Sequence, residues 1–178
     1  MEPVEYGSMG TKASSSLGIL IVDDDKTMRA LLHSLLLTFG VKNVFEAPDG
    51  ERGLLLLQSV EPDLVLTDYS MKPVDGVEFV KRVRALPSPL ARTPVIMVTG
   101  HAERHYVEEA RDAGITEFLC KPVTLRDLNA RILEVLEHPR PFVQAPTFIG
   151  PDRRRHRPGP YNGPRRRKDD RDVEVEFR

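Results

Sequence analysis

The sequence contains no tryptophan and only one cysteine among its 178 residues. A single thiol, Cys120, excludes an internal disulfide framework and suits a reducing compartment. No apolar run approaches the ~20 residues that a membrane helix needs, and the N-terminus lacks the basic-then-apolar order of a signal peptide. We therefore expect a cytoplasmic protein without a membrane span.

Charge and composition divide the chain into three parts. Residues 1–138 carry 15 Lys and Arg against 21 Asp and Glu, whereas residues 139–178 carry 11 against 6. Residues 1–16 are rich in Gly, Ser and Thr and show no apolar periodicity. We predict a disordered leader at 1–16, one folded domain at 17–138, and a disordered basic Gly/Pro/Arg tail at 139–178.

The predicted domain alternates short apolar runs with segments of helical periodicity. The runs, which we interpret as strands, cover residues 17–22, 41–47, 63–68, 94–99 and 117–120. Helical segments follow each run, and Asp25 and Asp75 stand where N-cap residues belong. Five strands alternating with five helices predict an α/β fold with a doubly wound, five-stranded parallel sheet in the flavodoxin-like order 2-1-3-4-5.

Reactive side chains follow four of these strands. Asp23 and Asp24 end the first, Asp68 the third, Thr99 the fourth, and Lys121 follows the fifth. The carboxyl ends of parallel strands share one edge, so the three carboxylates should converge at the topological switch point. Oxygen ligands of this kind suit Mg²⁺. With Lys121 and Thr99 facing an anion, the set is suited to phosphoryl transfer onto Asp68.

These motifs, in this order and spacing, resemble the receiver domain of two-component response regulators. The matching elements are Ile-Val-Asp23-Asp24, Asp68-x-x-Met-x-x-x-Asp75-Gly76, Val-Thr99-Gly100 and Lys121-Pro122. The resemblance covers residues 17–138. It implies that Asp68 accepts a phosphoryl group from a histidine kinase or a histidine phosphotransfer protein. It also implies that Asp23, Asp24, Asp68 and the backbone carbonyl of Ser70 bind Mg²⁺.

The resemblance further implies a conformational switch. Thr99 and Lys121 would contact the phosphoryl group, Thr99 and Phe118 would form the switch, and the Lys121–Pro122 bond would be cis. One departure is visible: Lys72 precedes Pro73, where the family commonly has proline directly after the methionine.

A stand-alone receiver that signals through protein contact is the function we expect. The segment after residue 138 is too short and polar for a DNA-binding or catalytic domain. We expect output through segments 103–113, 117–120 and 125–136, toward a downstream protein that the sequence does not name. Asp68 lacks a second carboxylate two residues on, which argues against an aspartate-nucleophile phosphatase. The only expected catalysis is the protein's own phosphorylation and dephosphorylation.

The basic tail contains a repeat that suggests an alternative function. Phe148-Ile-Gly-Pro and Tyr161-Asn-Gly-Pro each precede three arginines within the next four residues. Arginines bind phosphates and carboxylates, so nucleic acid, an acidic protein or anionic lipid are candidate partners. The alternative is therefore a nucleic-acid-binding regulator that acts through this tail. The tail could also fold back onto the acidic domain, or remain independent of it.

Overall fold

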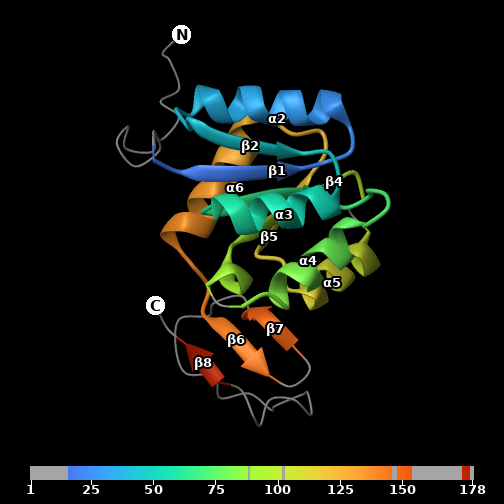
Figure 1. Cartoon of the computed structure of the whole chain (residues 1–178), viewed down its shortest axis with the longest axis vertical. Coiled ribbons are helices and arrows are strands. Elements are labelled where there is room, and N and C mark those ends of the chain that lie inside the picture. The colour runs from blue at the N-terminus through green and yellow to red at the C-terminus, as the bar shows by residue number, and fades with distance from the viewer. Residues whose placement is uncertain (1–15, 88, 102, 146–147, 154–173, 177–178) are drawn as a thin grey trace.

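The computed structural model describes residues 16–87, 89–101, 103–145 and 148–153, together with the backbone of 174–176. Two sheets are present in these residues (Figure 1). The larger one has the parallel order β2-β1-β3-β4-β5, which confirms the predicted topology. Its strands are β1 (Gly18–Val22), β2 (Asn43–Ala47), β3 (Leu64–Asp68), β4 (Val95–Thr99) and β5 (Glu117–Cys120).

Five helices cover the two faces of this sheet, and a short 3-10 helix, η1 (Leu90–Arg92), precedes β4. The helices are α2 (Lys26–Thr38), α3 (Gly50–Val60), α4 (Gly76–Arg84), α5 (Arg104–Ala113) and α6 (Leu125–Glu137). Apolar residues of α3, α4 and α5 pack on one face of the sheet, and those of α2 and α6 pack on the other. Because strands β1, β3 and β4 are buried throughout, they appear in the sequence as continuous apolar runs.

Aspartate N-caps fix where three helices begin. The side chains of Asp25, Asp49 and Asp75 accept hydrogen bonds from the first-turn amides of α2, α3 and α4. The Thr27 amide keeps the pKa of Asp25 below its usual value. The predicted capping roles of Asp25 and Asp75 are confirmed. Both caps lie close to the ends of β1 and β3, so they also set the path of the chain past the candidate site.

A small antiparallel sheet follows α6 and corrects the prediction for the tail. It consists of β6 (Phe142–Ala145), β7 (Phe148–Pro151) and β8 (Glu174–Glu176), in the order β7-β6-β8. Disorder was predicted from residue 139 onward, and this is wrong for β6 and β7. Four-residue strands flanked by prolines carry little periodicity, and contacts with the main body supply their stability. Residues 1–15 of the predicted leader at 1–16, and residues 154–173, lie outside the described residues.

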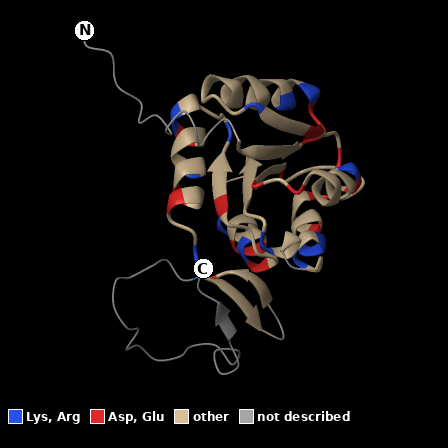
Figure 2. Ribbon diagram, turned by 60° about the vertical axis from the view of Figure 1, so that its left-hand side comes forward, with Lys and Arg blue, Asp and Glu red and all other residues tan. Residues whose placement is uncertain are grey.

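The β6–β7 pair, which we name the C-terminal hairpin, lies beyond the β5 edge of the main sheet (Figure 1). Figure 2 shows it at the end of the molecule away from α2, next to parts of the ribbon that are coloured for both acidic and basic residues. The hairpin contacts the C-terminal end of α5 through β7. Among the described residues, no helix is long and apolar enough to cross a membrane.

Candidate phosphorylation and metal site

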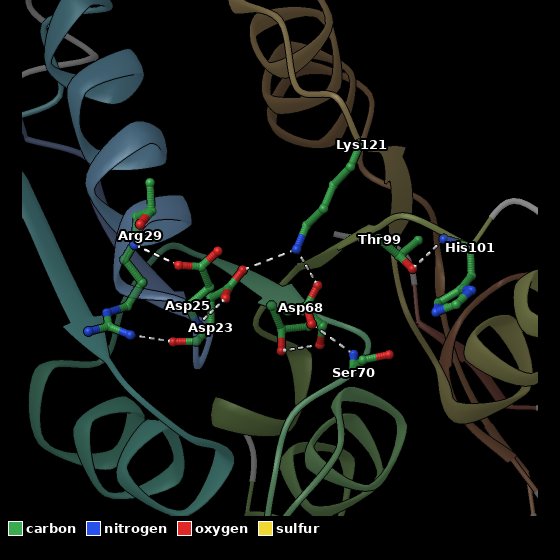
Figure 3. Close-up of polar contacts among 10 residues, drawn as sticks. Asp23, Asp25, Arg29, Asp68, Ser70, Thr99, His101 and Lys121 are labelled. Atoms are coloured by element: carbon green, nitrogen blue, oxygen red, sulfur yellow. Dashed lines mark hydrogen bonds and ion pairs between the residues drawn. The ribbon is translucent and has the colours of Figure 1, made fainter.

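The carboxyl ends of β1, β3, β4 and β5 bring the predicted site residues to one edge of the sheet (Figure 3). Asp68 is the last residue of β3 and Thr99 the last of β4, while Asp23 follows β1 directly. Lys121 follows β5, and its amide donates a hydrogen bond to the Thr99 carbonyl. Strand pairing alone therefore places these four residues side by side, as the sequence predicted.

Three carboxylates form a cluster at this edge. One oxygen from each of Asp23, Asp24 and Asp68 lies within 4.8 Å of the others. Asp23 and Asp68 are buried, whereas Asp24 is exposed. Burial is the main reason that the pKa of Asp23 is raised, with the Asp68 charge acting in the same direction. This set of oxygen donors, open to solvent at Asp24, fits a Mg²⁺ ion that keeps several water ligands.

Lys121 is the cation that faces the cluster. Its Nζ lies 2.7 Å from Asp68 Oδ1 and 3.5 Å from Asp23 Oδ2. Partial burial alone would lower its pKa, but the hydrogen bond and charge of Asp68, with those of Asp23, raise the pKa overall. Lys121 therefore remains charged at neutral pH. One cation against three carboxylates leaves an excess of negative charge that a divalent cation would offset.

The loop after Asp68 positions its carboxylate. The Ser70 amide donates a hydrogen bond of 2.8 Å to Asp68 Oδ2, so each oxygen of Asp68 accepts from a fixed donor. The chain then turns back until the Gly76 amide donates to the Tyr69 carbonyl. A Cβ at Gly76 would lie 2.1 Å from the Asp68 carbonyl oxygen, so only glycine permits this approach.

The predicted cis bond between Lys121 and Pro122 is confirmed, and Lys72–Pro73 is also cis. The side chain of Lys72, the residue that departs from the family pattern, is exposed.

The two predicted switch residues lie on neighbouring strands. Thr99 is 1% exposed, and its Oγ1 accepts a hydrogen bond of 3.0 Å from the His101 amide, which leaves its own hydroxyl proton to donate (Figure 3). Phe118 pairs with Met97 across β4 and β5 and packs partly buried against the core. The switch role of Phe118 and the binding of Mg²⁺ by the Ser70 carbonyl stay predictions.

An aromatic group beside the site was not predicted. The ring of Tyr69 makes edge contacts with His101 and Tyr106, whose rings are also 4.7 Å apart. Tyr69 Oη donates to Glu109 on α5 at 2.7 Å, and burial together with this partner raises the pKa of Tyr69. The sequence contained one indication of this group, because Tyr69 comes directly after Asp68 and His101 comes two residues after Thr99. The group connects the Asp68 loop to α5.

Comparison with known proteins agrees with this geometry. The family described as "Response regulator receiver domain" matches residues 19–133. The chain belongs to the response regulator receiver family. It is 36% identical over 124 residues to chemotaxis protein CheY-3 of Vibrio cholerae, covering 70% of this chain and 95% of that protein.

Two further relatives extend the comparison. Chemotaxis protein CheY of Pseudomonas aeruginosa is 39% identical over 119 residues, covering 67% of this chain and 95% of that protein. The solved structure of chemotaxis response regulator CheY4 of Vibrio cholerae aligns with a TM-score of 0.63 at 30% identity. That alignment covers 67% of this chain and 98% of the CheY4 chain.

The first copy of the arginine repeat begins in a strand, although it was predicted to lie in a disordered tail. Phe148 to Pro151 form β7, and Arg153 stacks at 3.7 Å over the Phe148 ring and pairs with Asp112 on α5. The described part of the first copy, residues 148–153, is therefore engaged within the molecule, in agreement with folding back onto the acidic domain. The second copy, at 161–167, lies outside the described residues. Nucleic-acid binding through it stays a prediction.

Proposed function

We propose that this receiver accepts a phosphoryl group on Asp68 and signals by contact with a downstream protein. The observation that supports this most directly is the Lys121 ammonium 2.7 Å from Asp68 Oδ1, within a cluster of three carboxylates. A buried carboxylate that faces one lysine and one hydroxyl can accept a charged group that both of them can bind. The related chemotaxis proteins support the same role.

In the proposed reaction, a carboxylate oxygen of Asp68 forms a bond to phosphorus as the bond from phosphorus to the donor nitrogen breaks. The donor is a phosphohistidine of a histidine kinase or a phosphotransfer protein, and the released imidazole takes up a proton from solvent. Lys121 and the Thr99 hydroxyl are placed to bind the transferred oxygens. Hydrolysis by water reverses the state, so the only chemistry proposed is the protein's own phosphorylation and dephosphorylation.

The residues that would bind Mg²⁺ are Asp23, Asp24, Asp68 and the backbone carbonyl of Ser70. When bound, the ion would supply positive charge for the developing charge on the phosphoryl group. Arg29 and Asp25 support this arrangement, because Arg29 Nη1 donates to the Asp23 carbonyl at 2.7 Å and the Asp25 amide to Asp23 Oδ1 at 2.8 Å. Asp23 is therefore fixed at both its backbone and its side chain.

The test is incubation with a small phosphodonor and Mg²⁺, followed by mass spectrometry of intact protein and peptides. We expect one added phosphoryl group, on Asp68, and none on Asp68→Asn. Asp25→Asn is the matched control, since it lies beside the cluster but caps α2, and asparagine caps equally well. Full labelling of Asp68→Asn would contradict the assignment.

The switch and the location form the remaining parts of the proposal. Phosphorylation would attract the Thr99 hydroxyl and shift the population of Phe118 conformations, with output through α5, β5 and α6. We also propose a cytoplasmic location, where a histidine kinase can reach Asp68.

A further inference from the structure

The C-terminal hairpin is attached to the receiver near the amino-terminal end of β5, whereas Asp68 lies at the carboxyl ends of the strands. Arg140, just before β6, forms an ion pair with Glu117, the first residue of β5. Arg131 of α6 approaches the other oxygen of Glu117 at 3.7 Å. Arg153, just after β7, pairs with Asp112 near the end of α5. Both ends of the hairpin therefore carry an arginine paired with a carboxylate of the receiver.

Close backbone packing joins the hairpin to the receiver between these two ion pairs. Gly114, which ends α5 with a φ of 98°, packs so tightly that an added Cβ would lie 2.7 Å from the Ile149 carbonyl oxygen. A Cβ at Gly150 would in turn lie 2.8 Å from Gly114 Cα. Contacts this close leave no room for water between β7 and the end of α5.

The buried arginine Arg84 lies beneath the hairpin and contacts Phe142 of β6. Arg84 is 4% exposed, and its ring partner Phe142 of β6 lies with its centroid 5.7 Å from the guanidinium. Arg92 approaches the same ring at 5.5 Å. Phe142 of the hairpin therefore packs against a buried charged group, and we expect displacement of the hairpin to change the solvation of Arg84.

Two short elements run from the phosphorylation site to these contacts. Strand β5 ends next to Lys121 and begins at Glu117, a length of about 13 Å for four residues. Helix α5, about 15 Å long, contacts Tyr69 through Glu109 near its middle and reaches β7 at its C-terminal end. The predicted switch residue Phe118 is the direct neighbour of Glu117 on β5. Each of these two elements therefore connects the site to one attachment of the hairpin.

We propose that the C-terminal hairpin is an output element of the receiver, whose docking onto α5 and β5 changes with the phosphorylation state of Asp68. This inference rests on the proposed function and adds a surface outside residues 17–138 to those that carry the signal. The coupling runs through the Glu117–Arg140 pair and the Gly114–Gly150 contact. Such coupling is reciprocal. The factor by which a phosphoryl mimic changes the docking equilibrium of the hairpin equals the factor by which docking changes the affinity of the site for the mimic.

The test is amide hydrogen exchange of the full chain with Mg²⁺ alone and with Mg²⁺ plus beryllium fluoride, a mimic of the acyl phosphate. We expect exchange of the β6 and β7 amides to change by about fivefold or more on adding the mimic. Strand β2, at the far edge of the sheet, reports any general stabilisation and serves as the internal reference. An unchanged ratio of hairpin to β2 exchange would overturn the proposal.

Two variants test the route. Glu117→Gln and Arg140→Gln each remove one charge of the pair and should abolish the response of the hairpin while the mimic still binds. Glu78→Gln is the control, because Glu78 forms a half-exposed ion pair with Arg82 on α4 away from the hairpin. Amide shifts of Lys121 and Thr99 report binding separately. In the wild-type chain, binding of the mimic without a response of the hairpin defeats this proposal alone, whereas failure of the mimic to bind defeats the proposed function as well. In the two variants, a hairpin response equal to that of the wild type would show that the coupling does not run through the Glu117–Arg140 pair.

Discussion

Replacing Arg84 by methionine is expected to destabilise the protein strongly. Methionine keeps the apolar stem but removes the guanidinium, which donates to the carbonyls of Gly114, Ala91 and Thr93 at 2.7–2.9 Å. These three carbonyls belong to the end of α5, to η1 and to the segment before β4. Without Arg84 they remain in a buried region with no donor, and three parts of the chain lose their common anchor.

The magnitude follows from two opposing contributions. Each hydrogen bond from a charged donor contributes roughly 1.5–3 kcal/mol. Burial acts against them by lowering the pKa of Arg84 to about 10, which corresponds to roughly 3 kcal/mol of lost solvation. Arg84→Met should therefore lower the free energy of unfolding by about 3 kcal/mol, within the range for breaking buried charged networks.

Urea denaturation followed by circular dichroism measures this change, since the chain offers no tryptophan signal. Arg82→Met is the matched control on the same helix: Arg82 forms a half-exposed ion pair with Glu78, for which we expect a loss of about 0.5 kcal/mol or less. A loss below about 1 kcal/mol for Arg84→Met would refute the reasoning, because it would show that burial of the charge cancels its hydrogen bonds.

Three further predictions concern the carboxylate cluster and the hairpin contact. Asp24→Asn should abolish the rise in melting temperature that Mg²⁺ gives the wild type, measured by thermal melts with and without the ion; an unchanged rise would place the metal elsewhere. Asp23→Asn should raise the free energy of unfolding of the metal-free protein at neutral pH, because burial penalises the ionised carboxylate. This gain should shrink as the pH falls through the raised pKa of Asp23 toward 3.8, where the wild-type group takes up its proton; urea titrations from neutral to acid pH test the sign. Gly114→Ala should cost about 1–3 kcal/mol, because its φ of 98° and the nearby Ile149 carbonyl exclude a side chain, and equal stability of the variant would show that β7 can move away.

The strands and the site were predictable because their physical causes are local or topological. The central strands are buried on both faces, so runs such as Leu64 to Leu66 stand out, and parallel pairing then puts Asp23, Asp68, Thr99 and Lys121 at one edge. No knowledge of side-chain packing was needed for this step.

The hairpin and the aromatic group depend on contacts between distant segments, which periodicity does not record. Phe142 and Phe148 lie in four-residue strands stabilised by Arg84 and Arg153, and neither arginine differs in sequence from a surface residue. Arg84 lies in a helix rich in basic residues, so its sequence context predicts an exposed side chain, yet the side chain is buried. The contact of Tyr69 with α5 is hidden in the same way, since Glu109 follows it by 40 residues.

The position of Phe142 over Arg84 affects how this receiver can be divided for experiments. A fragment ending at residue 138 would match the length of its chemotaxis relatives but would uncover the guanidinium, the end of α5 and the start of β5. We expect water to reach these groups in the fragment, and we expect the fragment to unfold less cooperatively than the intact protein. The folding unit therefore extends at least to residue 153, where Arg153 pairs with Asp112, which is beyond residue 133, where the family match ends.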